Sequence, residues 1–236
     1  GIEYLGQKRS LRFLKLYFQD YGCSIDFVKS PFLVQSDVVR DKRSGGRETL
    51  RLDTMHGASV QYHDADVVIF NTGHWWTHQK TCMGTRCFQG RLNMADAYRR
   101  ALTTWAQWVD SNINSSRTRV FFRGYSPSHF RNGQWNSGGH CHGEIEPTVN
   151  EALLAPSPWM TTILETIISE MRTPVFYLNV TKMTDYRKDG HPSIYLPQYR
   201  GSRRIEDCSH WCLPGVPDAW NHLLYVALLG FSHELA

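Results

Sequence analysis

The protein has 236 residues, 41% hydrophobic and 13% aromatic, so it can bury a sizeable core and is not intrinsically disordered. Its 26 basic and 22 acidic residues give a formal net charge of +4, which is too mild to predict a nucleic-acid partner. No apolar run approaches the ~18 residues of a membrane-spanning helix, and the polar first residues lack the apolar stretch of a signal peptide.

The first residues are typical of the middle of a domain, and the chain does not begin with Met. We therefore expect further sequence, including any membrane anchor, to precede Gly1. On this interpretation residues 1–236 form one domain that is incomplete at its N-terminus.

The first elements along the chain are a strand and a charged segment. Residues 23–34 are rich in β-branched and aromatic side chains and predict a strand that leads into a loop. Basic and acidic residues alternate from 37 to 53, which favours a solvated loop over a polyanion site. The run KRSGG at 42–46 predicts a flexible break within it.

Strands and helices then alternate. Apolar runs at 66–71, 119–125 and 175–180 predict buried parallel strands. Apolar residues at helical spacing predict helices at 93–112, within 147–171 and at 216–229. This order indicates an α/β fold with helices on both faces of a parallel sheet, and such sheets place their sites outside the carboxyl ends of the strands. Asn71, Gly124 and Thr181 follow those ends.

The most informative local pattern is Asp207-Cys208-Ser209-His210. A carboxylate three residues before a histidine can accept a hydrogen bond from Nδ1–H and leave Nε2 as a general base. Asp-x-x-His is common by chance, but here a rigid aromatic turn, Trp211 to Gly215, follows it. A base needs a nucleophile, and none of the serines is in a Gly-x-Ser-x-Gly or Gly-Asp-Ser context. The serines considered are Ser126, Ser128, Ser137 and Ser209.

A second cluster, His140-Cys141-His142, contains metal-ligand side chains. The spacing fits the common zinc sites poorly. Six cysteines and two glycosylation sequons, at Asn114 and Asn179, favour an oxidising compartment and disulfides instead.

Aromatic residues follow two of the predicted strand ends and are candidates for packing against sugar rings. Trp75 and Trp76 follow the first strand, where core packing and a binding role are equally compatible with the sequence. Trp105, on a helix face, is assigned to the core. Asn71 can stabilise an oxyanion through its amide or simply form a turn. The aromatic residues after the second strand are Tyr125, His129, Phe130 and Trp135.

Three long blocks carry a family resemblance: FNTGHWW (70–76), FFRGYSPSHFRNGQWNSGGHC (121–141) and DCSHWCLPGVPDAWN (207–221). With YFQDYGCSIDFVKSPFLV (17–34), they resemble the plant trichome birefringence-like family over nearly the whole chain. The resemblance implies a three-layer αβα sandwich like that of the SGNH/GDSL esterases. It also implies a Golgi type II membrane protein, with its catalytic part in the lumen, that O-acetylates wall polysaccharides such as pectin or xylan.

Under this resemblance Asp207 and His210 are the Asp and His of a Ser-His-Asp triad, whose serine belongs to a Gly-Asp-Ser block expected before Gly1. The chain alone is then expected to be inactive. No bound cofactor is implied. The acetyl donor, acetyl-CoA or another acetylated carrier, is a co-substrate, and the acceptor is the polysaccharide. Arg123, Asn71, His129 and the tryptophans 75, 76 and 135 are candidate oxyanion or substrate residues.

The resemblance also implies a Cys141–Cys208 disulfide, a partner for Cys212 before Gly1, and a small local loop closed by Cys82 and Cys87. Two other functions fit the same residues. A polysaccharide acetyl esterase would use the same triad with water as acceptor. A wall-glycan binding protein would use Trp75, Trp76 and Trp135 without catalysis. Of the possible acceptors, the blocks favour pectin, and they do not assign the hydroxyl.

Overall fold

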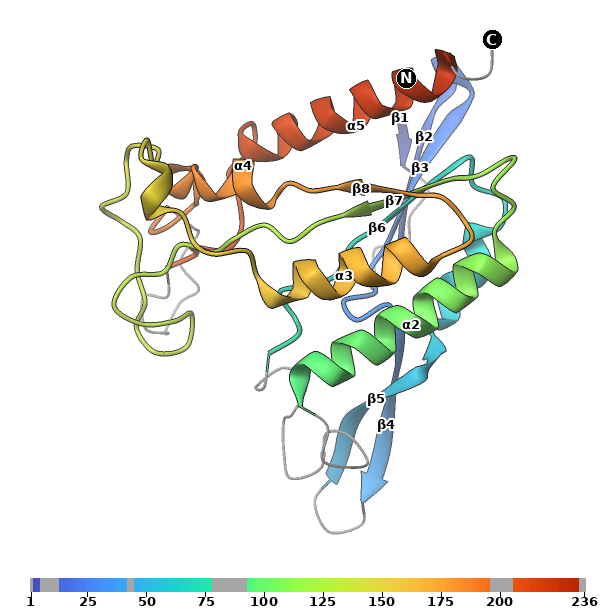
Figure 1. Cartoon of the computed structure of the whole chain (residues 1–236), viewed down its shortest axis with the longest axis horizontal. Coiled ribbons are helices and arrows are strands. Elements are labelled where there is room, and N and C mark those ends of the chain that lie inside the picture. The colour runs from blue at the N-terminus through green and yellow to red at the C-terminus, as the bar shows by residue number, and fades with distance from the viewer. Residues whose placement is uncertain (1, 5–12, 42–44, 78–92, 196–205, 234–236) are drawn as a thin grey trace. The chain divides into compact units, whose positions relative to one another are not determined.

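The computed structural model describes residues 2–4, 13–41, 45–77, 93–195 and 206–233 (Figure 1). The chain divides into two compact units. The first contains Gly1–Val120 and Ile163–Val175, and the second contains Phe121–Thr162 and Phe176–Ala236.

Strands and helices alternate through the middle of the chain, in the order β6 (Val67–Phe70), α2 (Met94–Asn112), β7 (Arg119–Arg123), α3 (Trp159–Glu170) and β8 (Val175–Leu178). The three strands form a parallel sheet in the order β6-β7-β8. The predicted α/β alternation is therefore confirmed, while the complete three-layer sandwich stays a prediction.

Helix α2 supplies much of the core of the first unit. Asn93 caps its first turn, because its Oδ1 accepts a hydrogen bond from the backbone N–H of Asp96 at 2.9 Å. The apolar residues recur every three or four positions and so form one buried face. Thr104 Oγ1 donates to the carbonyl oxygen of Leu52 at 2.6 Å and links the helix to strand β5 (Gly45–Met55). The buried face consists of Ala97, Tyr98, Ala101, Leu102, Trp105, Ala106 and Val109.

Aromatic rings meet edge to face against this helix. Phe70, the last residue of β6, contacts Trp105 with ring centroids 5.5 Å apart, and Trp76 contacts Tyr98 at 5.3 Å. Trp105 is fully buried, as its helical spacing predicted. Edge-to-face pairs of this kind add to the stability that burial alone provides.

Two antiparallel sheets complete the first unit. Strands β1 (Ile2–Tyr4), β2 (Phe13–Phe18) and β3 (Cys23–Val28) form one of them. Strands β4 (Val34–Asp41) and β5 (Gly45–Met55) form the other.

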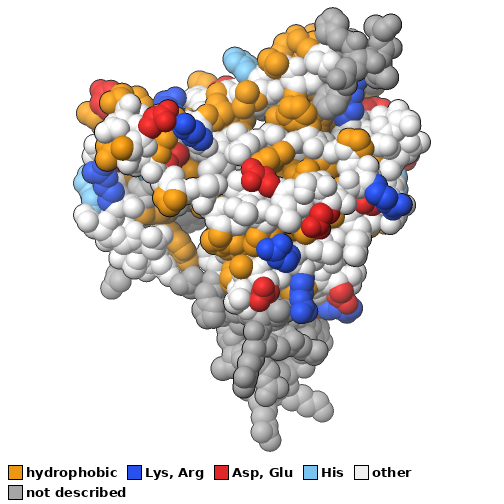
Figure 2. Space-filling view, viewed as in Figure 1, with side chains coloured by type: hydrophobic (Ala, Val, Ile, Leu, Met, Phe, Trp, Pro, Cys, Tyr) orange, Lys and Arg blue, Asp and Glu red, His pale blue; other side chains and the backbone are white. Residues whose placement is uncertain are grey.

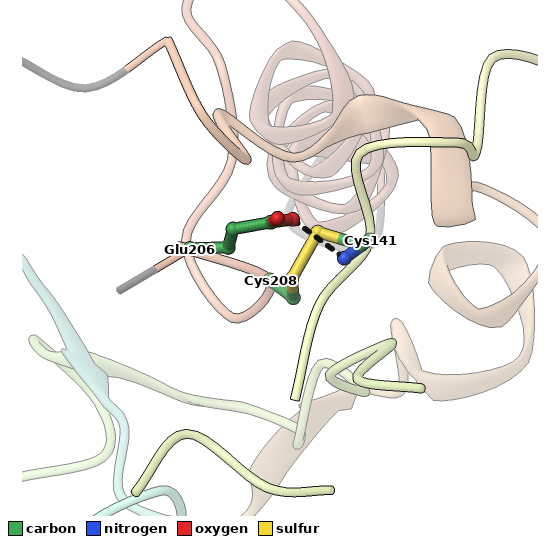
Figure 3. Close-up of side chains that lie close together, drawn as sticks. All are labelled: Cys141, Glu206 and Cys208. Atoms are coloured by element: carbon green, nitrogen blue, oxygen red, sulfur yellow. Dashed lines mark hydrogen bonds between the residues drawn. A yellow bond between two sulfur atoms is a disulfide. The ribbon is translucent and has the colours of Figure 1, made fainter. Parts of the chain in front are cut away.

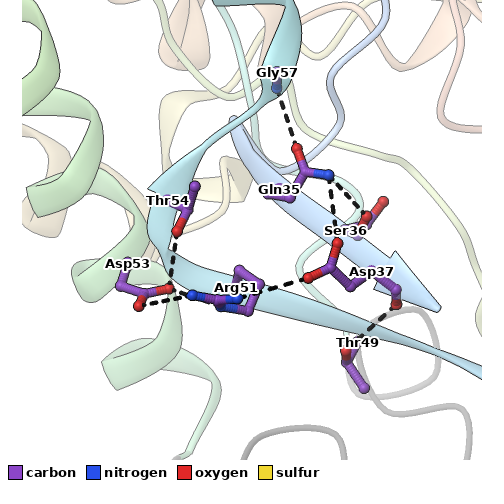
Figure 4. A network of polar contacts seen from close by, with 8 residues as sticks. All are labelled: Gln35, Ser36, Asp37, Thr49, Arg51, Asp53, Thr54 and Gly57. Carbon is purple, nitrogen blue, oxygen red and sulfur yellow. Dashed lines mark hydrogen bonds and ion pairs between the residues drawn. The ribbon is translucent and has the colours of Figure 1, made fainter. Parts of the chain in front are cut away.

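The prediction of a solvated loop between residues 37 and 53 is wrong, because both strands of the β4–β5 pair pass through it. The charged side chains described there lie on the strands (Figure 4). Arg51 Nε contacts Asp53 Oδ1 at 3.2 Å, and Arg51 Nη1 lies 3.8 Å from Asp37 Oδ2. Residues 37–53 do not show the regular apolar alternation of a half-buried strand, so the sequence pattern did not indicate this strand pair. Of the predicted flexible break at 42–46, residues 42–44 lie outside the described residues and residues 45 and 46 belong to β5.

The second unit carries long loops together with α4 (Thr181–Asp185) and α5 (Val216–His233). Helix α3 begins at Trp159 and ends at Glu170, within the range 147–171 in which a helix was predicted. Pro156 and Pro158 precede that start, and proline removes a backbone donor and disfavours helix in the residue before it.

Helix α5 carries several exposed apolar side chains, and Figure 2 shows hydrophobic side chains gathered on the surface where this helix runs. Tyr225 and Val226 are 62% and 64% exposed. None of the helices in the described part of the chain combines the length and apolar character needed to cross a membrane.

Candidate active site

The segment Asp207–His210 forms a tight turn that one carboxylate organises. Asp207 Oδ1 accepts hydrogen bonds from the backbone N–H groups of Ser209 and His210, at 3.1 and 2.9 Å. Asp207 Oδ2 lies 2.7 Å from Nδ1 of the His210 ring. The same side chain therefore shapes the backbone of the turn and orients the imidazole, as the three-residue spacing predicted.

The two side chains differ in their access to solvent. The Asp207 side chain is 15% exposed, whereas that of His210 is 82% exposed. Burial acts to raise the pKa of Asp207, but the hydrogen bonds from His210 and Ser209 outweigh it and hold this pKa well below its usual range. An ionised carboxylate accepts only, so the proton lies on Nδ1 of His210 and its basic nitrogen is Nε2.

A second histidine, His191, contacts the backbone of this turn. His191 is 6% exposed, and its Nδ1 lies 2.6 Å from the carbonyl oxygen of His210. Its ring stacks on that of Trp211, with centroids 4.1 Å apart. Burial lowers the pKa of His191 to about 4, so this ring is neutral at pH 7.

His129 lies behind His191, so the prediction that it contacts substrate is not supported. Its Nδ1 is 2.7 Å from Nε2 of His191, and its Nε2 is 3.2 Å from Oδ1 of Asp185. The His129 side chain is only 15% exposed, and its backbone N–H donates to the carbonyl oxygen of Cys208 at 3.0 Å. His129 thus belongs to the support of the turn and not to a sugar-binding surface.

A disulfide joins Cys141 to Cys208, the pair that the resemblance implied, with an S–S distance of 2.10 Å (Figure 3). Glu206 lies beside it and accepts from the backbone N–H of Cys141 at 2.8 Å, while its other oxygen lies 2.7 Å from Nδ1 of His142. Because both sulfurs are in the disulfide, Cys141 has no thiolate to offer to zinc. A zinc site at residues 140–142 would therefore lack its only sulfur ligand.

The remaining candidates are divided between the two units. Trp76 is 3% exposed and its Nε1 donates to Thr72 Oγ1 at 2.8 Å, so it belongs to the core, one of the two roles that the sequence left open. Trp75 is 43% exposed and Asn71 is exposed directly after β6. In the second unit, Trp135 is 41% exposed on a turn containing Gly133, whose φ of +147° favours glycine.

Arg123 ends strand β7 and is largely buried. Its guanidinium carbon lies 4.8 Å from the ring centroid of Trp220, and Nη1 donates to the carbonyl oxygen of Gly124 at 3.0 Å. Burial lowers the pKa of Arg123 to about 10. Gly124 is required here, since a Cβ at this position would lie 2.9 Å from Tyr177 Oη.

The serines of the described chain do not provide an evident nucleophile. Ser209 Oγ donates to Asp207 Oδ1 at 3.3 Å, and Ser137 Oγ accepts from the backbone N–H of Gln134 at 2.7 Å. Ser126 is buried, at 3% exposure. None of these serines is therefore assigned as the nucleophile. Cys82 and Cys87 lie outside the described residues, and Cys212 is exposed and is a free thiol in the structure.

Sequence reasoning missed His191, Asp185 and Glu206. The first two lie in the polar segment after β8, TKMTDYRKDGHPS, whose position at a strand end was the available signal. Glu206 is adjacent to the Asp-x-x-His pattern but has no recognisable motif of its own.

The parallel α/β core and the Asp-His turn are features expected of the GDSL/SGNH-like acyl-esterase class, and the sequence comparisons assign the chain to that class. The family model described as PC-Esterase, a GDSL/SGNH-like acyl-esterase family found in Pmr5 and Cas1p, matches residues 3–227. The chain belongs to the PC-esterase family and, within it, to the trichome birefringence-like proteins.

Three relatives from Arabidopsis thaliana illustrate the similarity. Protein trichome birefringence-like 4 is 57% identical over 225 residues, which cover 90% of this chain and 49% of that protein. Protein trichome birefringence is 51% identical over 231 residues, or 93% of this chain and 38% of that protein. Protein trichome birefringence-like 1 is 51% identical over 224 residues, or 90% of this chain and 40% of that protein. The chain thus spans less than half the length of these relatives.

Proposed function

We propose that this chain is the acid–base part of an enzyme that transfers acetyl groups to hydroxyl groups of a plant cell-wall polysaccharide. The observation that carries the proposal is the 2.7 Å contact between Asp207 Oδ2 and Nδ1 of an exposed His210, in a chain of the acyl-esterase class. Such a pair orients an imidazole so that Nε2 can accept a proton.

In the proposed mechanism the nucleophile is the serine of a Gly-Asp-Ser motif that precedes Gly1 in the whole protein. His210 removes its proton, and the serine attacks the acetyl carbonyl of the donor to form an acetyl-enzyme. His210 then gives the proton to the leaving group. A sugar hydroxyl attacks next, and His210 accepts its proton. As the tetrahedral intermediate collapses, the bond to the serine oxygen breaks and His210 returns this proton to that oxygen, which restores the free serine. The ionised Asp207 stabilises the imidazolium that forms at both stages.

The developing oxyanion requires N–H donors. We assign this role to backbone N–H groups. The side-chain amide of Asn71, which is exposed directly after β6, stays a prediction from the sequence. The donor is acetyl-CoA or another acetylated carrier and acts as a co-substrate, not as a resident cofactor.

The second candidate is a polysaccharide acetyl esterase, which the description of the matching family as acyl-esterases favours. The same acetyl-enzyme is hydrolysed when water replaces the sugar hydroxyl, so exclusion of water decides between the two activities. Pectin is the acceptor we propose first and xylan the second. We place the enzyme in the Golgi lumen, anchored by a segment that precedes Gly1.

The proposal is tested with the full-length protein and its His210→Ala variant, incubated with a labelled acetyl donor and pectin or xylan oligosaccharides. The variant should lose about a thousandfold or more in the rate of acetyl transfer, because residues of a triad act as a unit. His222→Ala, which removes an exposed histidine of α5, is the matched control. Equal transfer by His210→Ala and wild type would exclude the role of the pair.

Labelled acetate released to water in place of acetylated oligosaccharide would identify the esterase. A wall-glycan binding protein is the remaining alternative, because Trp75 and Trp135 are 43% and 41% exposed. It would bind the oligosaccharides with no acetyl transfer by any variant, and Trp135→Ala would weaken that binding.

A further inference from the structure

Next to the turn formed by residues 207–210, the buried His191 and the partly buried His129 form a chain of hydrogen bonds from a carboxylate to the backbone of His210. Asp185 lies against Nε2 of His129, Nδ1 of His129 lies against Nε2 of His191, and Nδ1 of His191 lies against the carbonyl oxygen of His210. The three contacts measure 3.2, 2.7 and 2.6 Å.

The partners at the two ends of the chain fix the number of protons. A backbone carbonyl can only accept, so Nδ1 of His191 carries a proton. Nε2 of His129 lies near two oxygens of Asp185, the side-chain Oδ1 at 3.2 Å and the backbone carbonyl at 3.1 Å, so it also donates. The contact between the rings needs one further proton. Three protons on four ring nitrogens give the histidine pair a single positive charge, which the Asp185 carboxylate balances.

The charged groups around the pair are acidic. Asp185 faces His129 from α4 and is itself held by the backbone N–H of Ala155 at 2.7 Å. Asp189, from the short helix Lys188–Gly190, and Asp207, from the catalytic turn, both act electrostatically on His191. Asp189 is already paired with Arg187 at 2.9 Å. The Asp185 carboxylate contacts the ring of His129 and not that of His191, so the positive charge of the pair lies on His129.

Removal of the third proton would disrupt this chain of hydrogen bonds. If the contact of His129 with Asp185 is kept, the proton between the rings must come from His191, and its Nδ1 then turns a lone pair toward the His210 carbonyl. Two acceptors 2.6 Å apart repel, so the support of the His210 backbone would be lost.

We propose that His191 is a positioning residue for His210, held in its donating form by the His129–Asp185 ion pair; as a statement about catalysis this rests on the function proposed above. Asp207 fixes the ring of His210, and His191 fixes its main chain. Misplacement of a catalytic group by about 1 Å can cost about a hundredfold in rate.

The first experiment compares two substitutions of His191 in the full-length protein. His191→Asn places an amide N–H near the position of Nδ1 and keeps the donor to His210. His191→Phe keeps a ring to stack on Trp211 but has no donor. We expect kcat for acetyl transfer to fall about tenfold or more in His191→Phe, with KM for the acceptor within about twofold, and to stay near wild type in His191→Asn. Equal kcat for both variants would overturn the proposal.

The second experiment tests the part played by His129. His129→Asn supplies an amide donor to Nε2 of His191, whereas His129→Phe supplies none. We expect kcat to fall in His129→Phe and to stay closer to wild type in His129→Asn. Equal kcat in the two variants would show that His129 does not control the turn.

The third experiment needs no activity and measures hydrogen exchange in the segment 206–212. The backbone N–H of His210 donates to Asp207 within that turn, so loss of the support should raise its exchange about tenfold or more in His191→Phe but not in His191→Asn. His222→Gln, on α5, is the control. If the wild type transferred no acetyl group, the proposed function would fail, yet this exchange difference would still decide whether His191 positions the turn. Equal exchange in the wild type and His191→Phe would refute it.

Discussion

At the scale of single residues, the two oxygens of Asp207 have different partners. Oδ1 accepts the backbone N–H groups of Ser209 and His210, and Oδ2 binds the ring of His210. An asparagine at this position keeps one oxygen for the backbone but presents an NH₂ group to the ring. Nδ1 must then accept, which moves the proton of the imidazole to Nε2, where a base needs a lone pair.

Asp207→Asn in the full-length protein should therefore lower the rate of acetyl transfer by about a thousandfold or more, with a much smaller effect on stability. Ser209→Ala, which removes only a 3.3 Å hydrogen bond to the same carboxylate, is the control and should stay within a few-fold of wild type. Near-normal transfer by Asp207→Asn would show that this carboxylate does not set the tautomer of His210.

The lowered pKa of His191, about 4, predicts a loss of stability in mild acid. An unfolded histidine takes up a proton near pH 6.5, whereas His191 in the folded protein resists it to about pH 4. The unfolded state therefore binds more protons in this window, and the free energy of unfolding falls as the pH falls. The slope is at most about 1.4 kcal/mol per pH unit.

Urea unfolding of the wild type and His191→Asn between pH 7 and pH 4 measures this contribution. The wild type should lose more stability over that window, because asparagine does not titrate. Asp207, whose pKa is lowered, adds a further loss as the pH falls below about 4. Parallel curves for the two proteins from pH 7 to pH 4 would contradict the assignment to His191.

The sequence predicted Asp207 and His210 together because the pair is local, with three residues between donor and acceptor spanned by one turn. It did not predict the support behind them, since His129 and His191 are brought together across 62 positions by the folding of the second unit. No periodicity or spacing marks such a contact. For Trp76 the sequence was equally compatible with a binding role and with the core, and its contacts with Thr72 and Tyr98 place it in the core.

At the scale of the elements, the Cys141–Cys208 disulfide joins two loops whose cysteines are 67 residues apart in the sequence. One of these loops contains the turn with Asp207 and His210. Closing a loop of this length restricts the unfolded chain, and native disulfides commonly contribute about 2–5 kcal/mol. Replacement of both cysteines by alanine should lower the free energy of unfolding of the full-length protein by this amount.

The single substitutions Cys141→Ala and Cys208→Ala provide the internal comparison, because either one breaks the same bond. Each should cost about as much as the double substitution, as measured by urea unfolding. Costs that add across the two sites would mean that the sulfurs stabilise the loops independently and are not bonded to each other.

The elements that the sequence predicted best are those with a strong apolar period or run. Helix α2 begins at Met94, one residue after the predicted start, because Asn93 caps it and seven buried positions recur along one face. The β4–β5 pair was missed because its sequence is rich in charged residues, some of which pair along and between the two strands, as Arg51 does with Asp53 and Asp37. Its stability depends on strand pairing and on contact with α2, which leave little trace in the local sequence.

At the scale of the whole molecule, the two glycosylation sequons bear on the compartment. Asn114 and Asn179 are both exposed, and each accepts a hydrogen bond from a backbone N–H two residues later, at 3.0 and 3.2 Å. A protein that passes through the secretory pathway offers exposed sequons to the glycosylation machinery.

The full-length protein isolated from plant cells should therefore carry a glycan at each asparagine, and Asn114→Gln and Asn179→Gln should each remove one, as measured by intact-protein mass. Asn150→Gln changes an exposed asparagine outside any sequon and should leave the mass of the attached glycans unchanged. Absence of glycans from both sites would contradict the proposed Golgi lumen.

The contact from His191 has a consequence for chemical complementation, because it ends on the main chain of residue 210 and not on its side chain. Removing the imidazole in His210→Gly leaves that carbonyl and its support in place, with Asp207 still shaping the turn. The missing ring was mostly exposed, so free imidazole from solvent has access to the vacated place beside the carboxylate. The variant of the whole enzyme should then be active only when imidazole is added. An experimenter can therefore start the reaction at a chosen time, without altering the nucleophile.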